Sequence, residues 1–342
     1  MKINFKKKNL HIISEAGVNH NGNRKLIKKL IKNAKLIGSN TIKFQTFLAE
    51  NLSTKSTPKA HYQKLNSLSK NETHYEMLKK LELSEDEHYY AIKLCKLYKI
   101  NFMSTAYDVE SAKFLINECN VRNIKVASAD IIDFRLHEYL SKKDISVIIS
   151  TGMSDLKEID ECYKIYKKFN KRHFALMHCV SNYPCKNSSL NLNVIEILRK
   201  RYKCEIGFSD HSNNNIAAIV SSTFGVNLFE KHFTLDRNLP GPDHKASYNV
   251  SEFENYINDI KLAKISLGKR IKKCQQEEKN MRLVSRKSIV AKLNISKKDI
   301  FTNKNLTFKR PGTGMSPMKI KKVLGRRSNK NYKKDDLIFF KI

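Results

Sequence analysis

Short apolar runs alternate along most of the chain with longer segments whose apolar positions recur at helical spacing. The runs are rich in β-branched and aromatic residues, as strands are. Eight such runs occur, at residues 11–16, 41–46, 100–105, 123–128, 146–151, 174–179, 205–210 and 227–232. Because strand and helix alternate, the pattern predicts parallel strands joined by right-handed helical crossovers.

The segments between the runs carry helix signals. Residues 26–37 place Leu, Ile and Ala on one face, and Gly38 follows where a C-cap is expected. A second helix is predicted over 111–118, with Asp108 ahead of it as a candidate N-cap. A third is predicted to begin at Ser154.

Eight strand–helix units within residues 1–268 predict an α/β fold, a (β/α)₈ TIM barrel. The alternative is an open, doubly wound sheet. No G-x-G-x-x-G follows the first run, which weakens that alternative. The residue pattern changes after the predicted barrel. Residues 269–283 are polar and are predicted to be a linker, and residues 284–342 form a small second domain with little core of its own.

Charge raises the question of a nucleic-acid partner. The formal net charge is +32, from 65 basic residues of which 13 are Arg and 52 are Lys, spread along the whole chain. Base reading and bidentate phosphate contacts favour Arg, and no nucleic-acid-binding motif is present. We therefore expect a compositional bias and no nucleic-acid partner, although a positive field would help to gather an anionic substrate.

Membrane and export signals are also missing from the sequence. No apolar run approaches the ~20 residues of a membrane span, and the first residues lack a signal-peptide pattern. The seven cysteines are scattered and form no C-x-x-C pair. We expect reduced thiols, a cytoplasmic location and no membrane partner.

Polar residues gather where the predicted strands end. In a barrel the carboxyl ends of the strands carry the catalytic groups. The members are Glu15, Lys43, Gln45, Thr105, Lys125, Ser128, Asp130, Ser150, Thr151, His178, Tyr183, Ser209, Asp210, His211, Glu230 and His232. Any one of them is explained by capping or surface exposure, but the joint pattern predicts a functional site.

Two kinds of chemistry fit this ring. Lys43 and Lys125 supply point charge for one phosphate, and nearby Ser and Thr hydroxyls supply donors, although helix capping also explains the hydroxyls. His211 and His232 end neighbouring strands, about 4.8 Å apart, so both imidazoles reach one divalent metal. Two unrelated strand-end histidines are the alternative. His20, His178 and His244 are weaker metal candidates, and His244 has no assigned role.

Several motifs together resemble the sialic acid synthases: N-acetylneuraminate synthase and its legionaminate and pseudaminate relatives. The resemblance covers nearly the whole chain, in order, and includes a C-terminal SAF (antifreeze-like) domain. The motifs are SEAGVNHNG (14–22), TIKFQT (41–46), STAYD (104–108), KVASAD (125–130), STGM (150–153), HCVSNYP (178–184), GFSDHS (207–212), EKHFTLD (230–236), GPDHKAS (241–247) and KRPGTG (309–314).

The resemblance implies a metal-dependent transferase that condenses phosphoenolpyruvate with N-acetylmannosamine or a related 2,4-diacetamido-6-deoxy-mannose and releases phosphate. It implies a homodimer with domain-swapped SAF domains. The metal is expected to be Mn²⁺, with Mg²⁺ and Co²⁺ as alternatives, held by His211 and His232. The N-acetylneuraminate type is the main expectation, and an N,N'-diacetyllegionaminate or pseudaminate synthase is the alternative.

The resemblance also distributes roles over the ring. Catalytic or water-orienting carboxylates are Glu15, Asp130 and Glu230. Phosphoenolpyruvate is expected near Lys43, Thr105, Lys125, Ser128, Ser150 and Ser209. Sugar contacts are expected from Gln45, Asn71, Tyr183, Asp243 and Arg310, the last reaching into the partner subunit's site.

One departure bears on the sugar, and two other activities remain open. Ala127-Ser128-Ala129-Asp130 stands where strict N-acetylneuraminate synthases carry Gly-Ser-Gly-Glu. A Schiff-base aldolase would use Lys43 or Lys125 as its nucleophile. A catalytically inactive, glycan-binding relative is the other alternative, against which the intact lysines and histidines argue.

Overall fold

The computed structural model describes residues 2–5, 9–60, 63–64, 72–169 and 173–339. The chain divides into two compact units, Met1–Gly268 and Lys269–Ile342.

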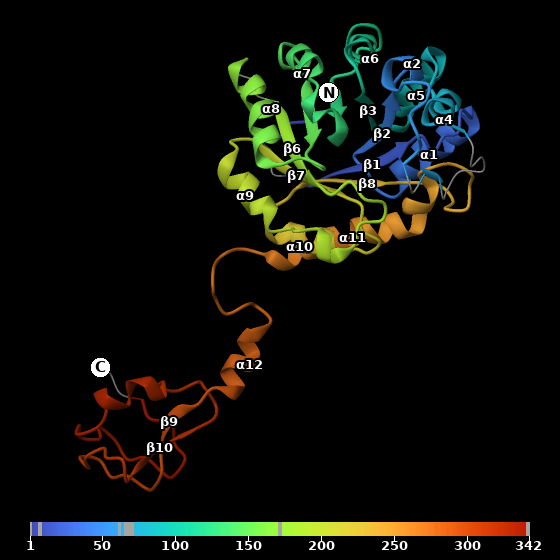
Figure 1. Cartoon of the computed structure of the whole chain (residues 1–342). Helices are drawn as coiled ribbons and strands as arrows, with labels where there is room; N and C mark the ends of the chain where they lie inside the picture. Colours follow the sequence, from blue (N-terminus) through green and yellow to red (C-terminus); the bar gives the residue numbers. More distant parts are fainter. Residues whose placement is uncertain (1, 6–8, 61–62, 65–71, 170–172, 340–342) are drawn as a thin grey trace. The chain divides into compact units, whose positions relative to one another are not determined.

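The first unit is a closed barrel of eight parallel strands in the order β1 to β8. Figure 1 shows the helices arranged around the strands. The predicted TIM barrel is thus confirmed. The strands are β1 His11–Gly17, β2 Thr41–Thr46, β3 Asn101–Ala106, β4 Asn123–Val126, β5 Ser146–Ser150, β6 Phe174–Cys179, β7 Glu205–Asp210 and β8 Leu228–His232.

The helices of this unit follow the strands in alternation, with extra turns in the longer connections. They are α1 Arg24–Leu36, α2 Ala49–Leu52, α4 His74–Leu81, α5 Glu85–Tyr98, α6 Val109–Lys113, α7 Phe134–Ser141, α8 Leu156–Lys168, α9 Val194–Arg201, α10 Ile216–Thr223 and α11 Val250–Leu267. None of the helices in the part of the chain that the structure describes is long and apolar enough to cross a membrane.

Local capping signals set the start of two of the predicted helices. Asp108 caps α6 as predicted, because its Oδ1 accepts from Ser111 N at 2.6 Å. The third predicted helix, α8, begins at Leu156, two residues later than expected. Its cap is Asp155, whose Oδ1 accepts from the amides of Lys157 and Glu158, while Glu158 reaches back in a capping box. The side chain of Asp155, and not that of Ser154, therefore caps the helix.

The inside of the barrel changes character along the strands. Inward positions in the amino-terminal half are apolar and pack as one cluster that includes Ile13, Met103, Ile148, Met177 and Leu228. Two residues further on, the same faces carry Glu15, Thr105, Ser150, Cys179 and Glu230. Because side chains alternate with a period of two, inward apolar side chains fill the amino-terminal end of the barrel, and inward polar side chains line its carboxyl-terminal end.

The second unit contains an antiparallel pair, β9 Ser288–Ala291 and β10 Leu306–Lys309, over its own small core. The segment predicted as a linker is not wholly irregular, because helix α12 occupies Glu278–Ser285. Arg310, a predicted sugar contact, belongs to this unit. It is exposed, and its Nε donates to Ser285 O at 2.9 Å.

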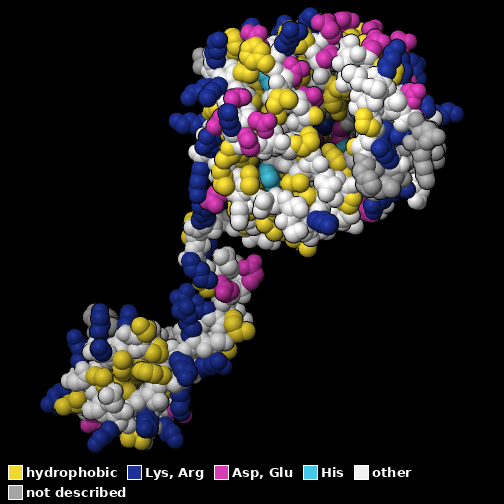
Figure 2. Space-filling model, viewed as in Figure 1, with side chains coloured by type: hydrophobic (Ala, Val, Ile, Leu, Met, Phe, Trp, Pro, Cys, Tyr) yellow, Lys and Arg dark blue, Asp and Glu magenta, His cyan; other side chains and the backbone are white. Residues whose placement is uncertain are grey.

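On the face of the barrel seen in Figure 2, Lys and Arg side chains are scattered among acidic and apolar side chains.

Candidate active site

A cavity of about 710 Å³ opens at the carboxyl ends of the barrel strands. Most of the predicted ring lines it. The lining includes Glu15, Lys43, Gln45, Thr105, Lys125, Ser128, Asp130, Ser150, Tyr183, Ser209, His211, Glu230, His232 and Asp243. The barrel topology thus brings together residues as far apart in the sequence as Glu15 and Asp243.

Two buried lysines converge on one carboxylate at the floor of the cavity. Lys43 Nζ lies 3.7 Å from Glu230 Oε1, and Lys125 Nζ lies 3.6 Å from the same oxygen. Burial opposes ionisation of Glu230, but Lys125, Lys43 and His211 outweigh it and lower the pKa of this carboxyl. Glu230 is therefore ionised at neutral pH, and its Oε2 is buried without a hydrogen-bond partner among the described residues.

Hydroxyl groups support the lysines. Lys43 Nζ donates to Thr105 Oγ1 at 2.9 Å, and Lys125 Nζ donates to Ser150 Oγ at 2.6 Å. Ser209 Oγ donates to Glu230 Oε1 at 3.3 Å. Ser128 Oγ accepts from the amide of Gly152 at 3.0 Å. Cationic groups and hydroxyls in this arrangement suit a phosphate.

A second carboxylate, Glu15, has a different environment. Its Oε2 lies 2.9 Å from Lys43 Nζ, and its Oε1 accepts from Gln45 Nε2 at 3.2 Å. Burial dominates, so the pKa of Glu15 rises to about 7, although Lys43 lowers it in part and Glu230 raises it further. The environments of the two buried glutamates therefore shift their pKa values in opposite directions, as suits an acid and a base.

Gly17 allows three of these side chains to meet. The strand pairing shifts between Glu15 and Gly17, and Gly17 has φ of +52°. A Cβ at this position would lie 3.2 Å from Gln45 Nε2, 3.3 Å from Glu15 Oε1 and 3.5 Å from Asp243 Oδ2. The bulge and the missing side chain are therefore part of the site.

Two more acids line the cavity with perturbed ionisation. Burial raises the pKa of Asp243 to about 6. Burial, followed by the neighbouring Asp133 carboxylate, raises the pKa of Asp130 to about 7. Asp130 Oδ2 is also a buried oxygen without a hydrogen-bond partner among the described residues. Both groups are thus sensitive to whatever occupies the cavity.

The histidine pair fits a divalent metal. The rings of His211 and His232 lie 5.6 Å apart between centroids, and Tyr183 packs against both, at 4.1 and 5.5 Å. His211 Nδ1 lies 2.8 Å from Val180 O, which assigns the proton to Nδ1 and leaves Nε2 free to bind a metal.

His232 is also ready to act as a ligand. Burial, and then the charges of His211 and Lys43, hold the pKa of His232 well below its ordinary value. Its Nδ1 is buried without a partner among the described residues. No group of three or more metal-binding His, Cys, Asp or Glu side chains occurs within the described ranges. The arrangement therefore offers two imidazole ligands, and a metal held by them would keep coordination positions open for substrate.

Three members of the predicted ring do not face the cavity. Thr151 Oγ1 donates to Met177 O, and His178 Nε2 lies 2.7 Å from Leu190 O, against the helix layer. Asp210 points outward and pairs with Lys231 at 3.0 Å. Strand alternation explains all three, because each is one residue from an inward position. Asn71, a predicted sugar contact, lies outside the described residues.

The loop that returns over the site after β8 gives His244 a structural role. Its Nδ1 lies 2.7 Å from Thr234 Oγ1, and its ring packs against Gly241. The side chain is fully buried. His244 thus supports the turn that carries Asp243 and does not line the cavity.

Sequence reasoning missed two parts of the cavity. Cys179 lines it with Sγ 3.7 Å from His211 Nδ1, at an inward position of β6. An apolar wall from the β1, β2 and β3 connections and α4 faces the charged floor. It comprises Val18, Phe47, Leu52, Met77, Leu78, Leu81 and Tyr107. The helical period of α4 indicates an apolar face, but not that this face borders a cavity.

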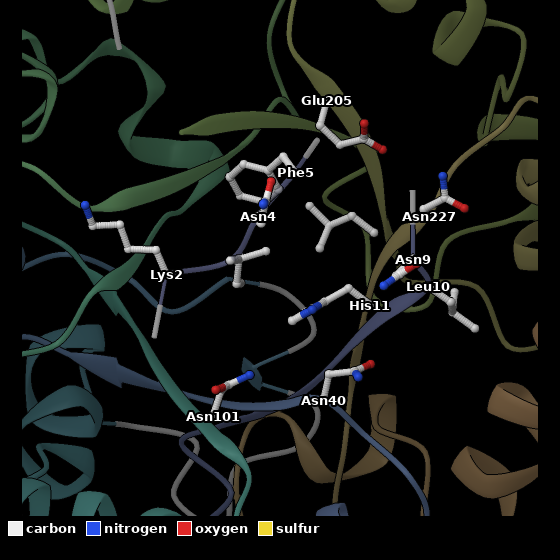
Figure 3. A pocket seen from close by; sticks show the side chains of 12 residues that line it. Lys2, Asn4, Phe5, Asn9, Leu10, His11, Asn40, Asn101, Glu205 and Asn227 are labelled. Atoms are coloured by element: carbon white, nitrogen blue, oxygen red, sulfur yellow. The ribbon is translucent and has the colours of Figure 1, made fainter. Parts of the chain in front are cut away.

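A smaller cavity of about 280 Å³ lies at the opposite, amino-terminal end of the barrel, where Figure 3 shows His11, Asn40 and Asn227 among its lining. Three polar groups there are engaged with the fold. His11 Nε2 lies 2.8 Å from Thr41 Oγ1, Asn40 accepts from Ile12 N, and Asn227 accepts from Lys264. It has the features of strand-start packing rather than those of a reactive site.

Comparison with known proteins agrees with the geometry. The NeuB family model matches residues 30–272, and the SAF domain model matches residues 286–341. An N,N'-diacetyllegionaminic acid synthase of Campylobacter jejuni is 39% identical over 330 residues, covering 96% of this chain and 98% of the relative. The N,N'-diacetyllegionaminic acid synthase of Legionella pneumophila is also 39% identical, covering 94% of this chain and 90% of the relative.

More distant relatives share the same family. Human N-acetylneuraminate-9-phosphate synthase is 30% identical over 96% of this chain and 90% of its own length. A crystal structure of the N-acetylneuraminic acid synthetase from Leptospira borgpetersenii superimposes with a TM-score of 0.71 at 28% identity, covering 82% of this chain and 95% of that chain. The chain therefore belongs to the NeuB family of sialic and legionaminic acid synthases, and it is an enzyme of that family with a C-terminal SAF domain.

Proposed function

We propose that this enzyme is an N,N'-diacetyllegionaminate synthase, which condenses phosphoenolpyruvate with a 2,4-diacetamido-6-deoxy-mannose and releases phosphate. The observation that carries the proposal is the convergence of Lys43 and Lys125 on Glu230 in the cavity that also holds His211 and His232. The relatives at 39% identity favour the legionaminate type over the N-acetylneuraminate type that the resemblance made the main expectation.

The phosphate of phosphoenolpyruvate would lie against the two lysines. Their ammonium groups supply charge, and Ser150 and Thr105, which they contact, supply neighbouring hydroxyls. Preorganised cations of this kind stabilise the charge that develops as phosphate leaves.

His211 and His232 would hold a divalent metal, for which we propose Mn²⁺. Such an ion supplies Lewis acidity toward the aldehyde oxygen of the open-chain sugar. Tyr183, which packs on both rings, fixes their orientation.

The reaction joins C3 of phosphoenolpyruvate to the sugar aldehyde carbon, and the aldehyde oxygen gains a proton. Water then adds to C2 and gives up a proton, after which the C2–O bond to phosphate breaks. We assign Glu230, ionised and with a free Oε2, as the base for the water. Glu15, whose pKa lies at about 7, is assigned as the proton donor to the aldehyde oxygen.

The apolar wall supports the choice of acceptor. A 6-deoxy sugar carries a methyl group where N-acetylmannosamine carries a hydroxymethyl group, and its second acetamido group adds another methyl. Phe47, Met77 and Leu81 present apolar surface to the same cavity as the lysines. Burial of those methyl groups is favourable, whereas burial of an unpaired hydroxyl is costly.

We further propose a cytoplasmic homodimer in which Arg310 of one subunit reaches the sugar site of the other. The exposure of Arg310 supports its availability for such a contact. Small-molecule substrates are the expected partners of the enzyme.

One assay tests the proposal. The purified protein is incubated with phosphoenolpyruvate and Mn²⁺, and phosphate release is measured with either the 2,4-diacetamido-6-deoxy sugar or N-acetylmannosamine. We expect higher kcat/KM with the diacetamido sugar. A preference for N-acetylmannosamine would reassign the enzyme to the neuraminate type, and no phosphate release with either sugar would refute the synthase activity.

A Schiff-base aldolase is the second candidate, and one observation favours it. Burial lowers the pKa of Lys125, and a neutral amine is the form that attacks a carbonyl. Lys43 is less suitable, because Glu15 and Glu230 outweigh its burial and raise its pKa. This activity would show borohydride trapping with pyruvate and indifference to EDTA, and the synthase would show neither.

A further inference from the structure

A buried ion pair lies on the outer side of the barrel wall, directly behind the two histidines. Lys231 and Asp210 are register partners on β8 and β7. Their side chains are 3% and 0% exposed, and Lys231 Nζ lies 3.0 Å from Asp210 Oδ2. His211 directly follows Asp210, the last residue of β7, and His232 directly follows Lys231 on β8. Because side chains alternate along a strand, the residues next to this outward pair face the barrel mouth.

The lysine also contacts the residue that follows His211. Its Nζ donates to Ser212 O at 2.7 Å, and Asp210 Oδ1 accepts from Ser212 N at 2.8 Å. Both peptide neighbours of His211 are therefore fixed by the ion pair. The carbonyl of His211 itself accepts from Cys185 N at 2.8 Å.

The same ammonium group is linked to His232 through an aromatic side chain. Lys231 Nζ lies 4.2 Å from the centre of the Tyr248 ring and 5.2 Å from that of Tyr256 on α11. Tyr248 N in turn donates to His232 O at 2.9 Å. The buried ammonium group of Lys231 is thus linked to the backbone beside both histidines.

A purely structural role would not require this placement. Replacing a buried ion pair by apolar groups is often neutral or stabilising, so the pair is weak support for stability as such. Its contacts instead converge on the two backbone segments that must stay in register for two imidazoles to share one ion. Partners that orient metal ligands typically affect metal affinity by about 10- to 100-fold.

We propose that Lys231, with Asp210, is a positioning residue that sets the separation and orientation of His211 and His232 for metal binding. This inference rests on the proposed metal role of the two histidines. Metal affinity, measured in the absence of turnover, should therefore depend on this ion pair.

The test measures Mn²⁺ affinity by EPR titration of the full-length protein without substrates, alongside thermal unfolding. The variants are Lys231→Met and the double variant Lys231→Met/Asp210→Asn, in which no buried charge is left unpaired. The matched control is Lys264→Met. Lys264 contacts Val226 O and Asn227 Oδ1. These two residues precede β8, at the end of the strand away from His232.

We expect both Lys231 variants to bind Mn²⁺ about 10- to 100-fold more weakly, with the double variant recovering thermal stability but not affinity. Lys264→Met should keep its affinity within about twofold of the parent on the same scale. If the double variant binds Mn²⁺ as the parent does, or if affinity follows stability in all three variants, the positioning role is wrong.

His232→Ala separates this inference from the proposed function. Loss of Mn²⁺ binding in His232→Ala, with unchanged binding in the Lys231 variants, overturns the positioning role alone. Unchanged binding in His232→Ala overturns the metal role of the histidines, and the positioning role with it.

Discussion

Because Gly17 has no side chain, we expect its replacement by alanine to disturb the site. Gly17→Ala should lower stability for two separable reasons. The backbone cost comes from φ of +52°, where a non-glycine residue loses about 1–2 kcal/mol. The steric cost comes from a Cβ placed 3.2 Å from Gln45 Nε2 and 3.3 Å from Glu15 Oε1, so both groups must move by a few tenths of an ångström.

Gly22→Ala is the matched control. Gly22 lies in the same β1–α1 connection with φ of +62°, and the nearest atom to its added Cβ is Lys80 O at 3.8 Å. It therefore carries the same backbone cost without touching the site. The free energy of unfolding, measured by urea denaturation, should fall by about 1–2 kcal/mol in Gly22→Ala and by at least that much in Gly17→Ala, which also bears the steric cost.

Activity should distinguish the two variants. Displacement of catalytic groups by about 1 Å costs about 100-fold, so a smaller shift at Glu15 and Gln45 should reduce kcat/KM by at least about tenfold in Gly17→Ala. Gly22→Ala should retain the parent's kcat/KM. Phosphate release from phosphoenolpyruvate is the assay. Equal kcat/KM in the two variants would refute the view that Gly17 holds these side chains together.

Four other predictions follow from the same geometry. Glu230→Gln should lower kcat by about 100-fold or more if this carboxylate is the base, without weakening phosphoenolpyruvate binding, because a negative charge near Lys43 and Lys125 is removed; an unchanged kcat contradicts the assignment. Burial raises the pKa of Asp130 to about 7, so the folded state disfavours its ionised form and loses stability as pH rises from about 4 to 7. Asp130→Asn should remove this loss, worth roughly 4 kcal/mol at pH 8, and urea denaturation at pH 4 and pH 8 checks whether the pH dependence persists. His232→Ala should abolish metal-dependent turnover, and full activity without added metal would disprove the metal role. Met77→Asn should reduce kcat/KM more for the diacetamido-6-deoxy sugar than for N-acetylmannosamine, and an equal reduction would remove the apolar wall from acceptor selection.

The alternation of strands and helices was readable in the sequence because burial enforces it locally. A parallel barrel strand is covered on both faces, so it appears as a short apolar run, and the predicted runs at 41–46, 174–179 and 205–210 coincide with β2, β6 and β7. The change from apolar to polar residues at each run's end marked the reactive end of the barrel. The histidine pair and both lysines followed from that change.

Tertiary structure decided which polar residues work together. The sequence placed Asp210 in the same ring as His211, but strand alternation turned it to the outer face. There it pairs with Lys231, whose Nζ lies over the rings of Tyr248 and Tyr256. The environment that makes Glu15 a weak acid and Glu230 an ionised base depends on distances to Lys43 and Lys125 across strands far apart in the chain. Residue types and their order are local properties that a sequence records. Burial, register and the approach of one charge to another arise only when the barrel closes.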